Sequence, residues 1–162
     1  MILVIAGHPL TNIKDFAKTV SNRINMNHVD IDDEKLLKNV GLYQNPIENT
    51  IYDGVVLAHK FVEKVIKIYI YEPKEQILAK MVEEKNLDLE EAEKKYDEIE
   101  KEKKSWANKF FGIDIKNLEI YDLIISTDKI DLDATIGVIE KYINKVNKWK
   151  WLKWQKWKKW QK

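Results

Sequence analysis

The chain has 162 residues, which is enough for one domain with a sizeable core. Its hydrophobic fraction of 44% and charged fraction of 34% exclude a wholly disordered protein. Cysteine is absent, which excludes disulfides, thiolate metal sites and cysteine nucleophiles. The sequence has no apolar run near the roughly 20 residues of a membrane-spanning helix and no secretory signal, so we expect a cytoplasmic protein.

Charge is distributed unevenly along the chain. The net charge is +1, yet residues 145–162 contain eight lysines and no acidic residue. The preceding 144 residues therefore hold 20 basic and 27 acidic residues, a net charge of −7. A mildly acidic body with a strongly basic segment suggests an arm that binds a polyanion. Arg23 is the only arginine, which matters because arginine is the usual bidentate ligand of phosphate.

Hydrophobic periodicity predicts alternating strands and helices in the first part of the chain. The apolar run at 1–6, ended by Gly7, is typical of a strand buried on both faces. The elements expected after it are a helix over 13–25, a strand over 28–31, a short helix near 33–39 and a strand over 50–53.

The same alternation continues in the second part. We expect a strand over 66–71, a helix over 74–85, one long helix or two helices with a bend over 88–111, a strand over 121–127 and a helix over 131–147. The long helix has a heptad-like apolar spacing, and Gly112 stands at the expected C-terminal position. Asp131 or Asp133 is the expected N-cap of the last helix. Strands that alternate with helices predict an α/β fold of three layers, a parallel sheet flanked by helices.

Four stretches of the sequence carry a resemblance to a known family. They are the opening run MILVIAGHP, the segment Tyr52-Asp53-Gly54 with Leu57-Ala58, residues 66–104, and the stretch from Phe111-Gly112-Ile113-Asp114-Ile115 to Thr127. Together they resemble the archaeal-type cytidylate kinases, which have the P-loop nucleoside monophosphate kinase fold. The resemblance covers most of residues 1–143. It implies a P-loop-kinase-like parallel sheet with a phosphate loop after the first strand.

The expected phosphate loop departs from the family pattern. That pattern is glycine, four residues, glycine, lysine, then serine or threonine, and it supplies backbone N–H groups, a cation and a magnesium-binding hydroxyl. Counted from the first glycine, the last three positions hold Asn12, Ile13 and Lys14, and a shift of one residue places Asp15 at the hydroxyl position. The remnant phosphate loop, which we expect to be inactive, consists of Gly7, His8, Pro9 and Lys14.

Two further departures favour a loss of activity. The stretch at about 32–49 is much shorter than the family's monophosphate-binding segment. Lysines stand where the family has lid arginines, namely Lys94, Lys95, Lys101, Lys103 and Lys104. Because phosphoryl transfer depends on positioning and charge stabilisation, we expect a pseudo-enzyme with no catalytic residue and no cofactor. An active kinase with an unusual loop and a non-catalytic nucleotide binder are the alternatives.

The second unusual feature is a Trp/Lys segment at residues 146–162, which holds five of the six tryptophans. Lysine neutralises phosphates and tryptophan stacks on exposed bases, which suits RNA. The same residue types suit a membrane interface, and a simple repeat expansion or a protein partner is a further alternative. The residues predicted to bind nucleic acid are Lys148, Trp149, Lys150, Trp151, Lys153, Trp154, Lys156, Trp157, Lys158, Lys159, Trp160 and Lys162.

These observations predict a kinase-like domain at 1–145 followed by the Trp/Lys segment. The function that we expect is structural RNA binding, most concretely as a ribosomal protein of an archaeal-type large subunit that descends from a cytidylate kinase. Ribosomal RNA and neighbouring ribosomal proteins are the expected partners, and a nucleotide ligand is not expected. Residual cytidylate kinase activity and membrane-surface binding are the alternatives. His8, His28 and His59 lack metal-ligand spacing, so no metal site is predicted.

Overall fold

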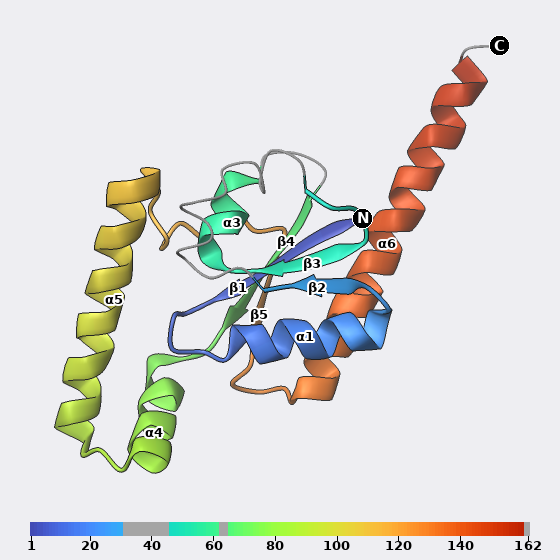
Figure 1. Ribbon diagram of the computed structural model, residues 1–162. Coiled ribbons are helices and arrows are strands. Elements are labelled where there is room, and N and C mark those ends of the chain that lie inside the picture. Colours follow the sequence, from blue (N-terminus) through green and yellow to red (C-terminus); the bar gives the residue numbers. More distant parts are fainter. Residues whose placement is uncertain (31–45, 62–64, 161–162) are drawn as a thin grey trace. The chain divides into compact units, whose positions relative to one another are not determined.

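The computed structural model describes residues 1–30, 46–61 and 65–160, with side chains up to residue 148. The chain forms two compact units, Met1–Asp128 and Lys129–Lys162. The first unit contains the sheet and the remnant phosphate loop (Figure 1). The second unit contains one long helix, α6 (Leu132–Trp160).

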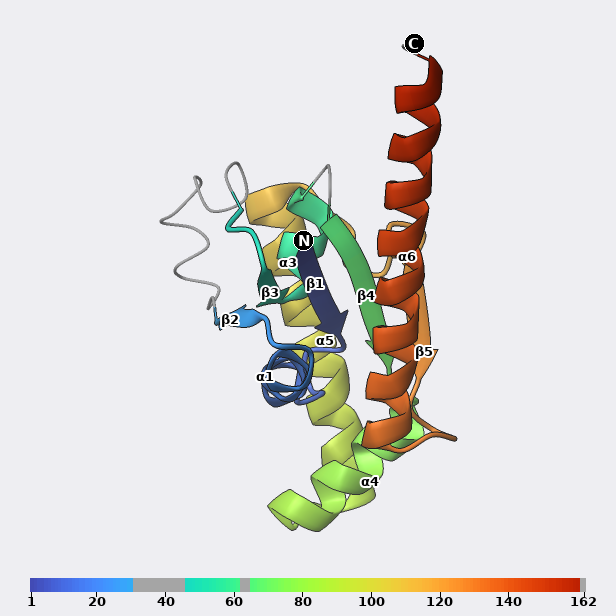
Figure 2. The same cartoon turned by 90° about the vertical axis from the view of Figure 1, so that its right-hand side faces the viewer.

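The first unit is built on a five-stranded sheet in which every pair of neighbouring strands is parallel (Figures 1 and 2). The strands are β1 (Ile2–Gly7), β2 (Asn27–Val29), β3 (Thr50–Asp53), β4 (Val65–Tyr71) and β5 (Leu123–Ser126), and their order across the sheet is β2-β3-β1-β4-β5. The central strand β1 is buried on both faces, which explains its continuous apolar run. The predicted α/β fold is confirmed.

Helices cover both faces of this sheet. Helix α1 (Ile13–Ile24) connects β1 to β2, and α3 (Val55–Lys60) connects β3 to β4. In the strand order of the sheet, the first connection runs away from β4 and the second runs toward it. Right-handed crossovers that run in opposite directions place their helices on opposite faces, as Figure 1 shows for α1 and α3. The predicted three-layer arrangement is therefore present in the first unit.

The core follows the alternation of side chains along β1. Ile2, Val4 and Ala6 face one side and pack in a cluster with Leu57 and Phe61 of the α3 region. Tyr52 of β3 joins the same cluster, with its ring centroid 5.2 Å from that of Phe61. This packing holds the turn between β3 and α3 against the central strand.

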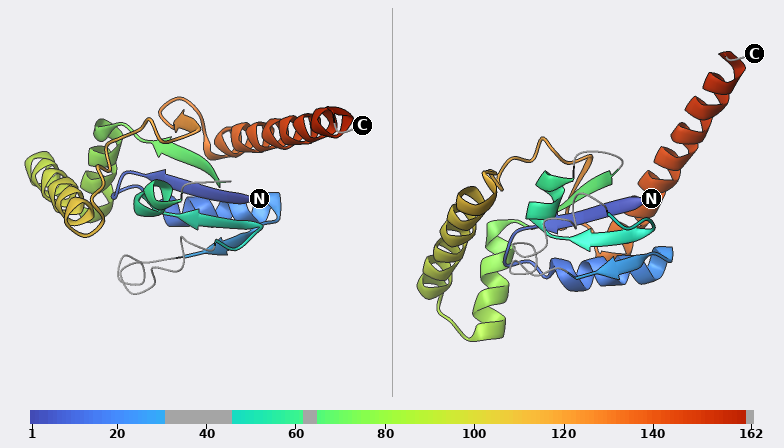
Figure 3. Two further views of the ribbon diagram at one scale, coloured as in Figure 1. Left: turned by 90° about the horizontal axis from the view of Figure 1, so that it is seen from above. Right: turned by 45° about the horizontal axis from the view of Figure 1, so that its top comes forward.

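Helices α4 (Lys74–Lys85) and α5 (Leu89–Phe111) form an antiparallel pair beside the carboxyl ends of the strands (Figure 3). Buried Ile77, Met81 and Tyr96 pack between them. A capping box begins α5, because the side chain of Asp88 accepts a hydrogen bond from the Glu91 N–H and that of Glu91 accepts one from the Asp88 N–H. Of the two expected possibilities, one long helix or two with a bend, the structure has the single helix.

Two elements differ from the sequence-based expectation. Helix α3 was not expected, because six residues are too few to show a helical period. Helix α6 continues from the expected end at residue 147 to Trp160, and its N-cap is Asp131, whose side chain accepts a hydrogen bond of 2.8 Å from the Ala134 N–H. The helix expected near 33–39 lies outside the described residues. Within the described residues, no helix has both the length and the apolarity needed to cross a membrane.

We predict that Gly7→Ala lowers the free energy of unfolding by about 1–3 kcal/mol. A Cβ atom at Gly7 would lie 2.4 Å from Cδ1 of Ile13 and 2.8 Å from Oγ1 of Thr11, so the buried Ile13 side chain would have to move. Urea unfolding measures the change. Gly137→Ala in α6 is the control, because a Cβ atom there meets nothing within 4 Å and alanine favours a helix. An unchanged stability of the Gly7 variant would contradict the prediction.

Candidate active site

The loop that follows β1 lies where the order of the strands reverses. Strand β1 is followed by α1 and its neighbour β3 by α3, and these two helices lie on opposite faces of the sheet (Figure 1). In parallel α/β sheets, ligands bind beyond the carboxyl ends of the strands at this position. The loop spans residues 8–12 and is followed directly by α1, whose N-cap is Asn12.

Backbone N–H groups of this loop donate hydrogen bonds within the chain. Thr11 N–H donates to the His8 carbonyl at 2.9 Å, and Ile13 N–H donates to the Thr11 carbonyl at 2.8 Å. Leu10 N–H donates to Nδ1 of the His8 ring at 3.2 Å. In a glycine-rich phosphate loop such groups point to the ligand instead. The loop of this chain therefore relies on side chains for the positive charge that a phosphate needs.

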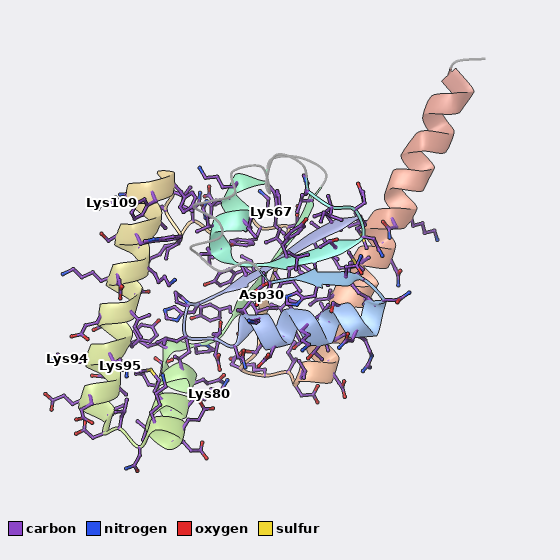
Figure 4. All side chains as sticks on the ribbon, viewed as in Figure 1. Asp30, Lys67, Lys80, Lys94, Lys95 and Lys109 are labelled. Carbon is purple, nitrogen blue, oxygen red and sulfur yellow. The ribbon has the colours of Figure 1, made fainter. Side chains whose placement is uncertain are left out.

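A cavity of about 420 Å³ lies on the β3 side of the loop, and we call it the β3-side cavity. Its lining includes Lys14 from α1, Asp30 after β2, Asp53 at the end of β3, and Lys103 and Trp106 from α5. Four elements that are distant in sequence thus supply two cations, two carboxylates and an aromatic ring. Asp30 is labelled in Figure 4 at the end of β2.

Lys14 is the cation nearest to the loop in sequence. Its ammonium forms an ion pair with Asp30, and this hydrogen bond raises the pKa of Lys14. The neighbouring Ile13 is buried instead and lies against Gly7. Ile13 and Lys14 both line the cavity, but the residue at the unshifted lysine position is apolar, so Lys14 is the one of the two that supplies a cation.

Asp53 is the most enclosed carboxylate of the β3-side cavity, and its side chain is 13% exposed. Nε2 of His28 lies 3.1 Å from Oδ1 of Asp53, which links the ends of β2 and β3. Burial raises the pKa of Asp53, and the hydrogen bond from His28 opposes that shift. Sequence reasoning noted Asp53 only within the family resemblance; the signal was a carboxylate followed by glycine directly after a buried strand.

A second cavity of about 260 Å³, the β4-side cavity, lies on the other side of the loop. Its lining includes Tyr69, Glu72, Lys74, Tyr96 and Lys116. Burial raises the pKa of Tyr69 to about 12, so this phenol keeps its proton at neutral pH. Both cavities share Gly7, His8 and Pro9, and the loop therefore separates two spaces that meet at His8.

His8 is held firmly in this position. Its ring stacks on Tyr96 of α5 with centroids 4.6 Å apart and an interplanar angle of 3°. Because Nδ1 accepts the hydrogen bond from Leu10, the proton of the neutral ring is on Nε2. That buried Nε2 makes no hydrogen bond within the described structure, and Oε1 of Glu100 lies 3.9 Å away. His8 thus offers a free donor between the two cavities.

The lysines that replace the expected lid arginines are not equivalent. Lys103 lines the β3-side cavity, and its ammonium lies 5.4 Å from the centroid of the Trp106 ring. Lys94 and Lys95 are exposed on α5 and line neither cavity (Figure 4). Lys101 and Lys104 are exposed in the same way. Lys116, beyond the end of α5, lines the β4-side cavity and pairs with Glu100 at 3.0 Å.

Beyond residue 148, the structure places the Trp/Lys segment only in its backbone. Residues 148–160 continue α6, and Lys162 lies outside the described residues. No ligand contact of these side chains is described, so nucleic-acid binding by them stays a prediction. The predicted boundary between residues 145 and 146 also stays a prediction, although the backbone of α6 is continuous there.

The sequence profile of the cytidylate kinase-like family matches residues 15–129. The chain belongs to the cytidylate kinase-like family. A cytidylate kinase of Methanocaldococcus jannaschii is 24% identical over 180 positions, which cover 91% of this chain and 100% of the relative. That of Methanosphaera stadtmanae is 29% identical and covers 88% of this chain and 98% of the relative. That of Staphylothermus marinus is 32% identical over 62% of this chain and 57% of the relative.

Solved structures support the fold. A protein of Eubacterium ventriosum superimposes with a TM-score of 0.71 at 17% identity, over 89% of this chain and 98% of that protein. A shikimate kinase of Acinetobacter baumannii superimposes with a TM-score of 0.54 at 13% identity, over 89% of this chain and 93% of the kinase. The predicted family and the P-loop-kinase-like fold are therefore confirmed.

The expectation of a non-catalytic ribosomal protein is wrong. Relatives that align over nearly the whole chain are named cytidylate kinases, which identifies an enzyme family with nucleotide partners and gives no support for ribosomal RNA or ribosomal proteins. The expectation of lost activity rested on the altered phosphate loop, the short stretch at about 32–49 and the lysines at the lid positions, each of which was judged from its neighbours in sequence. A loop motif does not reveal Lys103 or Lys116, which reach the two cavities only in the folded chain.

We predict that His8→Phe makes the protein less sensitive to acid. Burial lowers the pKa of His8 from 6.5, and Glu100 and Glu72 oppose this shift while Lys116 adds to it. As the pH falls below 6.5, His8 takes up a proton in the unfolded chain but not yet in the folded chain, so the free energy of unfolding decreases. Phenylalanine keeps a ring against Tyr96 and cannot be protonated.

Urea unfolding at about pH 7.5 and about pH 5.5 measures this effect. The His8→Phe variant should lose less stability between the two pH values than the wild type, and Lys18→Met on α1 should lose as much as the wild type. An equal loss in the His8 variant would show that burial of this ring carries no proton-linked cost.

Proposed function

We propose that this protein is a nucleoside monophosphate kinase that transfers a phosphoryl group from ATP to CMP. The observation that supports this most directly is the pair of cavities that meet at the loop after β1, within a chain that belongs to the cytidylate kinase-like family. Phosphoryl transfer needs a donor and an acceptor whose phosphates approach in line. Two cavities that share His8 and Pro9 provide one space for each nucleotide.

In this proposal lysine side chains, and not a backbone loop, neutralise the phosphates. Lys14 and Lys103 line the β3-side cavity, and Lys74 and Lys116 line the β4-side cavity. Each lysine acts as a point charge on a flexible stem, whereas arginine would bind two oxygens at once. A bound phosphate would compete with Asp30 for Lys14 and with Glu100 for Lys116, because both pairs are partly exposed.

His8 adds a neutral donor to this set. Its Nε2–H lies at the point shared by the cavities and has no hydrogen-bond partner in the described structure. Stacking on Tyr96 and the hydrogen bond from Leu10 hold the ring in one orientation. We assign it the role of a hydrogen-bond donor to an oxygen of the transferred phosphoryl group, where negative charge is shared between donor and acceptor.

Kinases of this family use a magnesium ion with the nucleotide. No group of three or more potential metal ligands is present among the described residues, so the protein alone does not form a closed metal site. Magnesium at such sites is held by one or two carboxylates together with the phosphates of the substrate. Asp53 and Asp30 in the β3-side cavity fit this role. The ion would supply positive charge to the phosphates. The proposed enzyme is also expected to act in the cytoplasm.

An assay with ATP, Mg²⁺ and CMP, UMP or AMP tests the function. The purified chain should convert CMP to CDP, with ADP formed in equal amount, and product separation by anion-exchange chromatography measures both. Heat-denatured protein is the control for contaminating kinase. If no monophosphate is converted although the protein is folded by circular dichroism, the proposed activity is wrong.

We predict that Lys14→Met lowers kcat/KM for CMP by roughly 10²–10³-fold, the usual effect of removing one group that stabilises developing charge. Its folding stability should hardly change, because an exposed ion pair contributes little. Lys18→Met is the matched control, since Lys18 is exposed on the same helix and lines neither cavity. Equal activity of the two variants would remove Lys14 from the active site.

A further inference from the structure

The Trp/Lys segment takes no part in the proposed phosphoryl transfer. It contains Trp149, Trp151, Trp154, Trp157 and Trp160, and no acidic residue occurs after Glu140. The backbone of this segment is helical up to Trp160, as the last part of α6. The conformation matters, because it decides how a Trp-x-Lys repeat distributes its tryptophans around the segment.

In a helix, successive residues are separated by about 100° around the axis. The five tryptophans then occupy an arc of about 200°. Ile136, Ile139, Ile143 and Val146 of the preceding turns fall within the same arc, so the apolar side of α6 continues into the Trp/Lys segment. The lysines that fall on the opposite arc are Lys145, Lys148, Lys156 and Lys159.

This pattern is that of a basic amphipathic helix with a broad aromatic side. Indole rings favour the boundary between headgroups and acyl chains, where one end of the ring is apolar and the other is wet. Lysines on the opposite side, and lysines within the aromatic arc whose stems are long enough to reach water, face anionic headgroups. A half-cylinder of tryptophan is too wide for a coiled-coil seam, which is a narrow stripe.

We propose that the Trp/Lys segment binds the surface of an anionic membrane, with its helical residues 146–160 in the plane of the interface. Charge complementarity identifies the partner. Residues 145–162 contain eight lysines and no acidic residue, whereas the rest of the chain carries a net charge of −7, so the positive charge that an anionic surface attracts is concentrated in this segment. The segment lies on the membrane and does not cross it, because lysines interrupt every apolar stretch. The helical backbone favours this partner over single-stranded RNA, for which an extended segment would present tryptophans along one edge.

Binding to vesicles tests the proposal with the full chain. Vesicles of phosphatidylcholine with 30% phosphatidylglycerol should co-sediment the protein, and pure phosphatidylcholine vesicles should bind it much more weakly. Tryptophan emission should shift to shorter wavelength on binding, and this signal reports the segment because five of the six tryptophans lie in it. Added salt should weaken binding, since it screens the lysines.

Two double variants identify the residues that act. Lys156→Glu with Lys159→Glu should weaken binding to the anionic vesicles by roughly 30-fold or more, the effect of removing two charges near the surface. Trp154→Ser with Trp157→Ser should weaken co-sedimentation with the same vesicles, because two indole rings are lost from the interface. Lys94→Glu with Lys95→Glu on α5 makes the same charge change in exposed residues outside both cavities and should leave binding unchanged.

Several outcomes would overturn the membrane proposal. One is equal binding of wild type and the Lys156/Lys159 variant. Another is equal loss in the α5 variant, which would indicate non-specific charge. Binding to a 20-nucleotide RNA together with no binding to the anionic vesicles would identify nucleic acid as the partner instead. Each variant is shown to be folded by its retained CMP kinase activity or, if the wild type has no such activity, by an unchanged circular dichroism spectrum. The vesicle result is therefore independent of the proposed reaction.

Discussion

The burial of β1 on both faces determines where chemistry can occur in this protein. The strand lies between β3 and β4, and the chain leaves its carboxyl end where the strand order reverses. Gly7 ends the strand so close to Ile13 and Thr11 that a side chain there would have to displace theirs. The loop from His8 to Asn12 is therefore held at one place, with a cavity on each side of it. The proposed reaction depends on this separation.

Around the loop, the chain combines fixed and exchangeable contacts. His8 is fixed by Tyr96 and by the N–H group of Leu10, and Asp53 by His28. Lys14 and Lys116 instead form partly exposed ion pairs, which a phosphate can replace at little cost. This division explains how a site can bind highly charged nucleotides although its loop uses several of its N–H groups internally.

The two compact units carry different kinds of information. The first unit holds the sheet and both cavities, and its family membership connects it with nucleotide chemistry. The second unit holds α6, in which a periodic apolar side continues into the Trp/Lys segment. We propose kinase activity for the first and a membrane-surface contact for the second, so that the same chain would act on a soluble nucleotide while attached to a lipid surface.

The sequence by itself determined the element order, the parallel sheet and the family, because apolar periodicity and turn residues are local signals that β1, α4 and α5 display strongly. It did not determine α3, which is too short to show a period, or the full length of α6. The motif at the loop predicted an inactive protein because it counts only neighbours in sequence. Tertiary structure decided the site, since Lys14, Asp53 and Lys103 come from three separate elements and meet only when the strands align at their carboxyl ends.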